Sequence, residues 1–148
     1  MYEVIKFFHL AAGLVWLGGM STLIWAVRPV AVAQLAPPVR IPFLTRVLAR
    51  FFAAVALCIT ILLVTGGLML AGVDLHIAPK GWHAMLGVGL LMCLIFGHIF
   101  FVPFRRLQRA SALGDWPAAA AQLRQIHFLV LTNFALGWLA VAAVVIWR

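Results

Sequence analysis

The sequence has few charged side chains and almost no acids. Only 9% of its 148 residues are Asp, Glu, Lys or Arg, whereas a soluble globular domain carries about 25%. The acids are Glu3, Asp74 and Asp115, and none lies inside a long apolar run. The sequence therefore has too few carboxylates for catalysis by a carboxylate pair or for a proton relay that depends on acidic residues. No phosphate loop or serine-hydrolase elbow is present.

Cysteine is also scarce. The two cysteines, Cys58 and Cys93, both fall within long apolar stretches, away from an oxidising compartment. A disulfide is therefore not expected, and the fold must be held together by other means.

Long apolar runs dominate what is present, since 66% of the residues are hydrophobic. Crossing the membrane hydrocarbon takes about 20 apolar residues in a helix. Four windows meet this length, at residues 4–27, 51–71, 81–104 and 126–147. Four spans with short connections predict an all-α fold, an up-down bundle of four transmembrane helices. We expect residues 1–148 to form a single integral membrane domain.

The net charge of +8 is unevenly distributed. Eight arginines flank or fill the first and third connections: Arg28, Arg40, Arg46, Arg50, Arg105, Arg106, Arg109 and Arg124. Only Lys6, Lys80 and Arg148 lie on the opposite side. The positive-inside rule then predicts an N-out/C-out topology with the arginine-rich connections in the cytoplasm. The basic excess indicates topology and a lipid bilayer as partner, and no nucleic acid.

The two arginine-rich connections differ in their local patterns. The first contains four of the seven prolines, which predicts an extended or short surface-lying segment. In the third, Asp115 resembles a helix cap and Pro117 suits a first helical turn. We therefore expect a helix to begin near Pro117 and to continue into the fourth span.

Five histidines accompany the three acids, and four of them lie in or at the ends of the spans. Ionisable residues at membrane depth usually face the bundle interior and mark a site. By depth they form an outer pair, His9 with His83, and an inner pair, His98 with His127. Because 15 residues separate His83 from His98, these two lie about 22 Å apart along the helix. At about 100° per residue the two side chains differ in direction by only about 60°, so both can face the same bundle interior.

The surroundings of these histidines suit a bulky planar ligand. Gly13 and Trp16 follow His9 along one stripe of the first helix, and Gly87 follows His83 by one turn. The small residues leave room beside each imidazole and the aromatic ring forms a wall. We expect His9, His83, His98 and His127 to ligate the iron of one or two b-type haems. Ligation on both faces favours electron transfer with a quinone or another redox partner.

Further along the fourth span, His127 leads to Leu131, Phe134 and Trp138 on one stripe. Purely structural roles for all these features stay open. A membrane histidine is commonly an interhelical hydrogen-bonder, and glycines and aromatic stripes commonly serve packing.

Copper is the competing ligand. Soft sulfur donors that suit Cu(I) are supplied by Met20, Met69, Met85, Met92, Cys58 and Cys93. They form no MxxM, MxxxM or CxxC cluster, and methionine is a routine gap-filler in apolar helices. A copper site at the outer mouth, built from His9, His76 and His83, is the alternative to haem.

Four polar residues within the spans are expected to form hydrogen bonds between helices. They are Thr60, Thr65, Thr132 and Asn133. Such bonds hold neighbouring membrane helices together. We do not assign these residues to catalysis.

Three stretches carry a family resemblance: FFHLAAGLVWLGGM at 7–20, KGWHAMLGVGLLMCLIFGHIFFVPFRRL at 80–107 and LRQIHFLVLTNFALG at 123–137. They resemble the copper-resistance D (CopD)-like integral membrane proteins and the related HemJ-type protoporphyrinogen oxidases. The resemblance covers nearly the whole chain, with four helices in the same order. On the CopD-like side it implies copper handling.

On the HemJ-like side the resemblance implies haem b and oxidation of protoporphyrinogen in the bacterial inner membrane. His9 and Trp16 match the first-helix motif of that family, and His83 and His98 match its third-helix histidines. The family has a lysine two positions after the first of these, where this chain has Met85. That lysine is implied to serve the oxidase reaction, so activity as a haem-dependent oxidoreductase is left open. Pairing of two copies into a homodimer is also left open.

Overall fold

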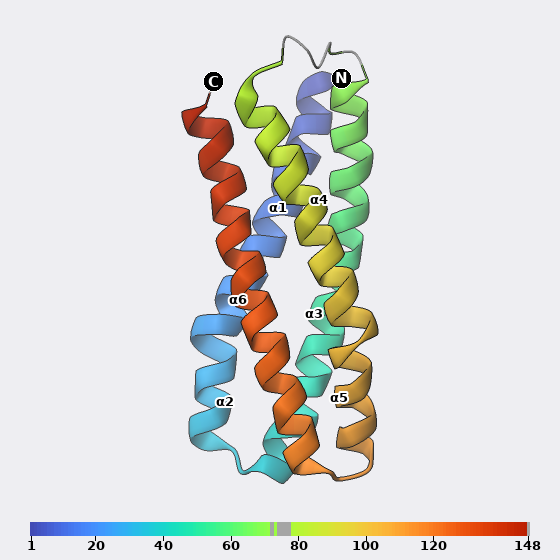
Figure 1. The fold of residues 1–148 in the computed structure, drawn as a ribbon, viewed down its shortest axis with the longest axis vertical. Coiled ribbons are helices and arrows are strands. Elements are labelled where there is room, and N and C mark those ends of the chain that lie inside the picture. Colours follow the sequence, from blue (N-terminus) through green and yellow to red (C-terminus); the bar gives the residue numbers. More distant parts are fainter. Residues whose placement is uncertain (72, 74–77, 148) are drawn as a thin grey trace.

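The fold is given by a computed structural model, which describes residues 1–71, 73 and 78–147. Over these residues every regular element is helical (Figure 1). The elements are α1 (Tyr2–Thr22), the π-helix η1 (Leu23–Val27), α2 (Arg28–Gln34), α3 (Pro37–Leu70), α4 (Lys80–Phe101), α5 (Pro103–Ala112) and α6 (Trp116–Ile146). The predicted all-α fold is thereby confirmed.

These elements make four long rods that run up and down (Figure 1). The rods are Tyr2–Gln34, Pro37–Leu70, Lys80–Ala112 and Trp116–Ile146, and each is long and apolar enough to cross a membrane. The chain is therefore a multi-pass membrane protein. Both termini lie at one end, called here the termini end. The opposite end, which holds α2, α5 and the start of α6, is called here the arginine-rich end.

The rods are longer than the predicted spans. Each has 31 to 34 residues, so it is about 50 Å long at 1.5 Å per residue. The hydrocarbon layer is only about 30 Å thick. The excess length allows the helices to continue past the hydrocarbon at the arginine-rich end, where the charged residues are concentrated.

The first connection was expected to be extended or a short surface-lying segment, and the extended alternative is wrong. Only Leu35 and Ala36 separate α2 from α3. The helix α3 begins at Pro37, where a missing backbone N–H costs nothing, because the first N–H groups of a helix have no partner within it. The third connection is also largely helical, as α5, which begins at Pro103 after a break at Val102.

The start of α6 was predicted correctly. Asp115 is its N-cap, and the Asp115 carboxylate accepts a hydrogen bond from the Ala118 N–H at 3.0 Å. Pro117 lies in the first turn. Just before the cap, Gly114 has φ +70°, a left-handed conformation that glycine adopts without strain.

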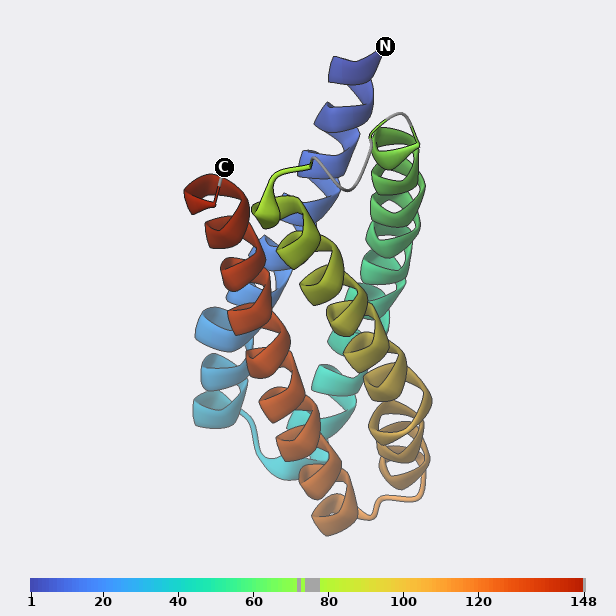
Figure 2. The same cartoon turned by 45° about the horizontal axis from the view of Figure 1, so that its top comes forward.

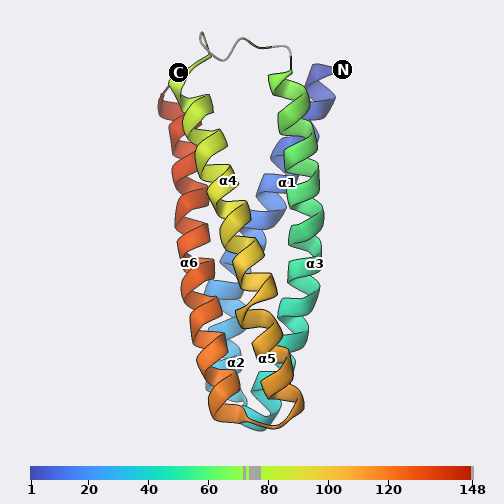
Figure 3. The ribbon, with the colours of Figure 1, turned by 45° about the vertical axis from the view of Figure 1, so that its right-hand side comes forward.

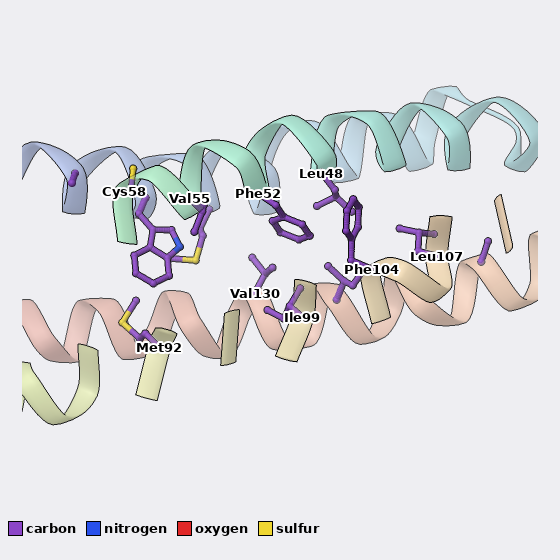
Figure 4. Packing of buried hydrophobic residues seen from close by; sticks show 14 of the residues in the cluster. Leu48, Phe52, Val55, Cys58, Met92, Ile99, Phe104, Leu107 and Val130 are labelled. Carbon is purple, nitrogen blue, oxygen red and sulfur yellow. The ribbon is translucent and has the colours of Figure 1, made fainter. Parts of the chain in front are cut away.

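The four rods pack as two pairs, α1 against α3 and α4 against α6 (Figures 2 and 3). Aromatic rings join the pairs near the middle of the bundle. The Phe96 ring of α4 meets Trp16 of α1 at a centroid distance of 6.4 Å and Phe52 of α3 at 5.7 Å. Figure 4 shows the apolar core around Phe52 and Ile99, which continues to Phe104 and Leu107 toward the arginine-rich end.

Most large apolar side chains outside this core are exposed on the surface of the bundle. Leu14, Leu57, Leu94 and Val145 are examples, one from each rod, and each is more than half exposed. In water such a surface would be unstable, but in a bilayer it contacts lipid tails. The exposed apolar surface therefore supports the membrane assignment independently of sequence length.

Candidate functional site

His9 of α1 packs against α3 inside the membrane region. Its Nδ1 lies 2.9 Å from Oγ1 of Thr65, and the His9 side chain is half-buried. Thr65 itself is buried. The predicted interhelical role of Thr65 is therefore confirmed, and its partner is the first histidine of the chain.

The bonds around Thr65 assign the tautomer of His9. The Thr65 hydroxyl lies 2.6 Å from the carbonyl oxygen of Ile61, one turn back on α3, and donates its proton there. With that proton used, the Thr65 oxygen can accept from His9, and on this basis we assign the imidazole proton to Nδ1. This assignment leaves the Nε2 lone pair available for a metal ion, because a second-shell hydrogen bond to one ring nitrogen fixes the ligand role of the other.

Gly66 of α3 lies beside the imidazole of His9. A Cβ atom added to Gly66 would be 3.4 Å from Cε1 and 3.9 Å from Nδ1 of His9, so the ring rests on the bare backbone of α3. Gly13, which was predicted to make this room, has nothing within 4 Å of an added Cβ. The glycine that lies against His9 is therefore Gly66 of the neighbouring helix, and not Gly13.

Below His9, toward the bundle centre, Trp16 is 5% exposed and belongs to the core. Three sulfur-bearing side chains share this core cluster: Met20 from α1, Cys58 from α3 and Met92 from α4. Cys58 and Met92 appear at the same end of the cluster in Figure 4. These residues form no cluster along the sequence, because they come from three different helices.

The remaining predicted ligand histidines of the spans lie on α4 and α6. His83 and His98 of α4 are exposed, so the expectation that they are buried between helices is wrong. His127 of α6 is half-buried and lines a small cavity at the arginine-rich end. His76 lies outside the described residues. Gly87 is exposed, with open space around it.

Neither of two hollows among the described residues has two histidines in its lining. The cavity that His127 lines has a volume of about 40 Å³. A larger hollow of about 290 Å³ lies between α3 and α4, and its lining contains Cys93 and Phe96 but no histidine. Within the described part of the chain, no three His, Cys, Asp or Glu side chains form a metal-binding group.

The other three predicted interhelical bonds have mixed outcomes. Asn133 of α6 is 2% exposed, and its Nδ2 donates to the Met92 carbonyl of α4 at 3.2 Å, as expected. Thr60 and Thr132 instead donate to carbonyls of their own helices, Ala56 and Phe128. A threonine hydroxyl on a lipid-exposed helix face has no other acceptor within reach.

Two residues of the His9 site were missed or only partly identified by sequence reasoning. Thr65 was expected to bond between helices, but not to His9, and Gly66 was not singled out. A polar residue followed by glycine inside an apolar run was the available indication. Only the register between α1 and α3, which places Thr65 opposite His9, turns this pattern into an indication of a site.

Comparison with known proteins identifies one family. The family described as copper resistance protein D matches residues 45–147, from the first turns of α3 to the end of α6. The match includes Thr65 and Gly66 and excludes α1 with His9. No curated protein and no solved structure matches the chain.

Proposed function

Because the chain belongs to the copper resistance protein D family, we propose that it binds and handles copper within the membrane, with His9 as a copper ligand. The observation that carries this proposal is the hydrogen bond from His9 to Thr65, which leaves one ring nitrogen free. Imidazole is a good ligand for copper in both of its common oxidation states.

The soft donors on the helices around His9 favour Cu(I) over harder metals. Met69 follows Thr65 by four residues, so it occupies the same face of α3 one turn nearer the termini end. Toward the centre the core contains Met20, Cys58 and Met92. Thioether and thiol groups are the soft donors that select Cu(I). Carboxylates, which would favour harder cations, are absent from the described parts of the membrane helices except Glu3, near the start of α1.

In this proposal copper enters at the termini end, and His83 and His76 stay predicted ligands of the outer mouth. His83 is exposed near the start of α4, and His9 lies in the first half of α1; both helices begin at the termini end (Figure 1). An exposed imidazole there is accessible to an incoming ion, whereas His9 is half-buried against α3. The order of capture is then from His83 to His9.

The experiment is a copper titration of the detergent-purified protein under reducing, anaerobic conditions, with a chromogenic Cu(I) chelator as competitor. His9→Ala is expected to abolish the tight site. Thr65→Val keeps the side-chain shape but removes the second-shell partner, and we expect about a 10- to 100-fold loss of affinity. Thr60→Val is the matched control, because the Thr60 hydroxyl bonds only to its own helix.

Unchanged Cu(I) affinity in His9→Ala would refute the proposed site. The same samples also test the haem hypothesis through their visible spectra, oxidised and dithionite-reduced. A Soret band with sharp reduced α and β bands that weaken in His9→Ala would replace copper by a b-type haem and electron transfer. Equal losses in Thr65→Val and Thr60→Val would show that Thr65 has no special role.

A further inference from the structure

A second polar site lies at the arginine-rich end, independent of copper. Arg28, the first residue of α2, and His127 of α6 line one cavity of about 40 Å³. The other seven lining residues are aliphatic side chains of η1, α3 and α6. Arg28 and His127 are both half-buried. Two nitrogen-rich side chains therefore meet in an otherwise apolar hollow.

The π-helix η1 places Arg28 at this cavity. Pro29 has no N–H, and its ring clashes with the carbonyl four residues before it in a regular helix. Just before Pro29, the Arg28 N–H bonds to the carbonyl of Leu23, five residues back, so the turn is widened. Such a widened turn changes the direction of the side chains that follow, and it is frequent at functional sites.

Arg28 has no acidic partner among the described residues. Of the acids described, Glu3 lies 4.0 Å from Lys6 at the termini end, and Asp115 caps α6. The third acid of the chain, Asp74, is outside the described residues. An arginine at the membrane boundary without a carboxylate favours an external anion, and a guanidinium can donate two parallel bonds to a phosphate group.

An aromatic strip continues from this cavity toward the middle of the membrane. Trp25 of η1 meets Phe134 of α6 edge-to-face at 5.3 Å, and Phe134 meets Trp138 at 6.3 Å. Trp25 and Trp138 are 68% and 56% exposed, so the strip faces the lipid. It lies on the stripe of α6 that begins at His127. An anion bound at Arg28 would thus have an apolar surface beside it.

We propose that this surface is a binding site for an anionic phospholipid of the leaflet at the arginine-rich end. The phosphate lies between Arg28 and His127, and one acyl chain lies along Trp25, Phe134 and Trp138. Charge complementarity selects the anion. The membrane-facing aromatic strip selects a lipid over a free phosphate, because a soluble anion gains nothing from that strip.

The test is native mass spectrometry of the full chain in detergent, titrated with phosphatidylglycerol or phosphatidylcholine of the same acyl chains. We expect wild type to bind phosphatidylglycerol about tenfold more tightly, and Arg28→Gln to lose about that factor, as for a hydrogen bond to a charged group. Arg106→Gln is the control. It removes the same charge from an exposed position on α5 outside the cavity and should change the affinity less than about threefold.

Two further variants keep the test decisive if Arg28→Gln does not fold. Arg28→Lys keeps the charge but loses the two-pronged geometry, and should bind with intermediate affinity. Trp25→Ala should weaken phosphatidylglycerol while leaving the charge intact. Equal losses in Arg28→Gln and Arg106→Gln, equal binding of the two lipids, or displacement of the lipid by millimolar inorganic phosphate would each overturn the proposal.

Discussion

Gly81 lies where the first turn of α4 meets the last turn of α6. Its N–H donates to the Trp147 carbonyl at 3.0 Å, which joins the two helices at the termini end. A Cβ atom at this position would lie 2.5 Å from the Ala143 oxygen and 2.6 Å from the Trp147 oxygen. Both neighbours are backbone atoms, so neither can rotate away. The substitution Gly81→Ala must therefore push the helices apart.

The size of the effect follows from these distances. A carbon and a carbonyl oxygen in ordinary contact are about 3.3 Å apart, so the backbones must separate by about 0.7 to 0.8 Å. Overpacking of this kind costs about 1–3 kcal/mol. The stretched interhelical hydrogen bond adds about 0.6 kcal/mol, the average in a membrane protein. The helix propensity of alanine returns at most about 1 kcal/mol. We expect a net loss of about 1–3 kcal/mol of unfolding free energy.

Gly87→Ala on the same helix is the matched control. Nothing lies within 4 Å of an added Cβ at Gly87, so only the propensity gain applies and stability should stay equal or rise. The assay is equilibrium unfolding in mixed micelles titrated with a denaturing detergent, followed by circular dichroism. If the two alanine variants unfold within about 0.5 kcal/mol of each other, the close backbone approach inferred at Gly81 is wrong.

Two further predictions use the same unfolding assay. Asp115→Ala should cost about 1 kcal/mol, because it removes the acceptor of the Ala118 N–H, and Asp115→Ser should retain most of the stability; equal stability of both variants would contradict the capping role. Asn133→Leu should be neutral or stabilising. It removes the single hydrogen bond to Met92, but it also removes a buried Oδ1 that has no partner in the described structure. A loss above about 2 kcal/mol would show that this oxygen has a partner, such as a buried water.

Local patterns predicted much of the fold. The four apolar runs and the cap at Asp115 depend on neighbouring residues, so the sequence contains all that is needed. The first connection did not follow from its prolines, because proline is compatible both with an extended segment and with a first helical turn. The structure uses the second option at Pro37. Composition alone cannot distinguish these cases.

The candidate site was harder to predict because it depends on rotation and register. Each residue turns a helix by about 100°. Ile99 is 1% exposed, whereas its neighbour His98 is exposed. A small error in the assumed direction of the core from α4 is therefore enough to predict His98 as buried. The bond between His9 and Thr65 joins residues 56 positions apart. Depth along the membrane was accessible from the sequence, whereas the partner of each histidine was not.

The two polar sites lie at opposite ends of the bundle, and their separation bears on the fate of a bound cation. Thr65 beside His9 and Leu48 beside Arg28 are 17 residues apart on α3, which is about 25 Å. With an effective dielectric constant of about 20, Arg28 raises the energy of a copper(I) ion at His9 by about 0.7 kcal/mol, and of one 10 Å away by about 1.7 kcal/mol. An unneutralised arginine-rich end therefore opposes movement of the ion away from His9. If copper binds at His9 and an anionic phospholipid at Arg28, as proposed, the lipid would cancel this one charge and lower the energy of an ion 10 Å away by about 1.7 kcal/mol, while the other arginines of that end would keep their effect.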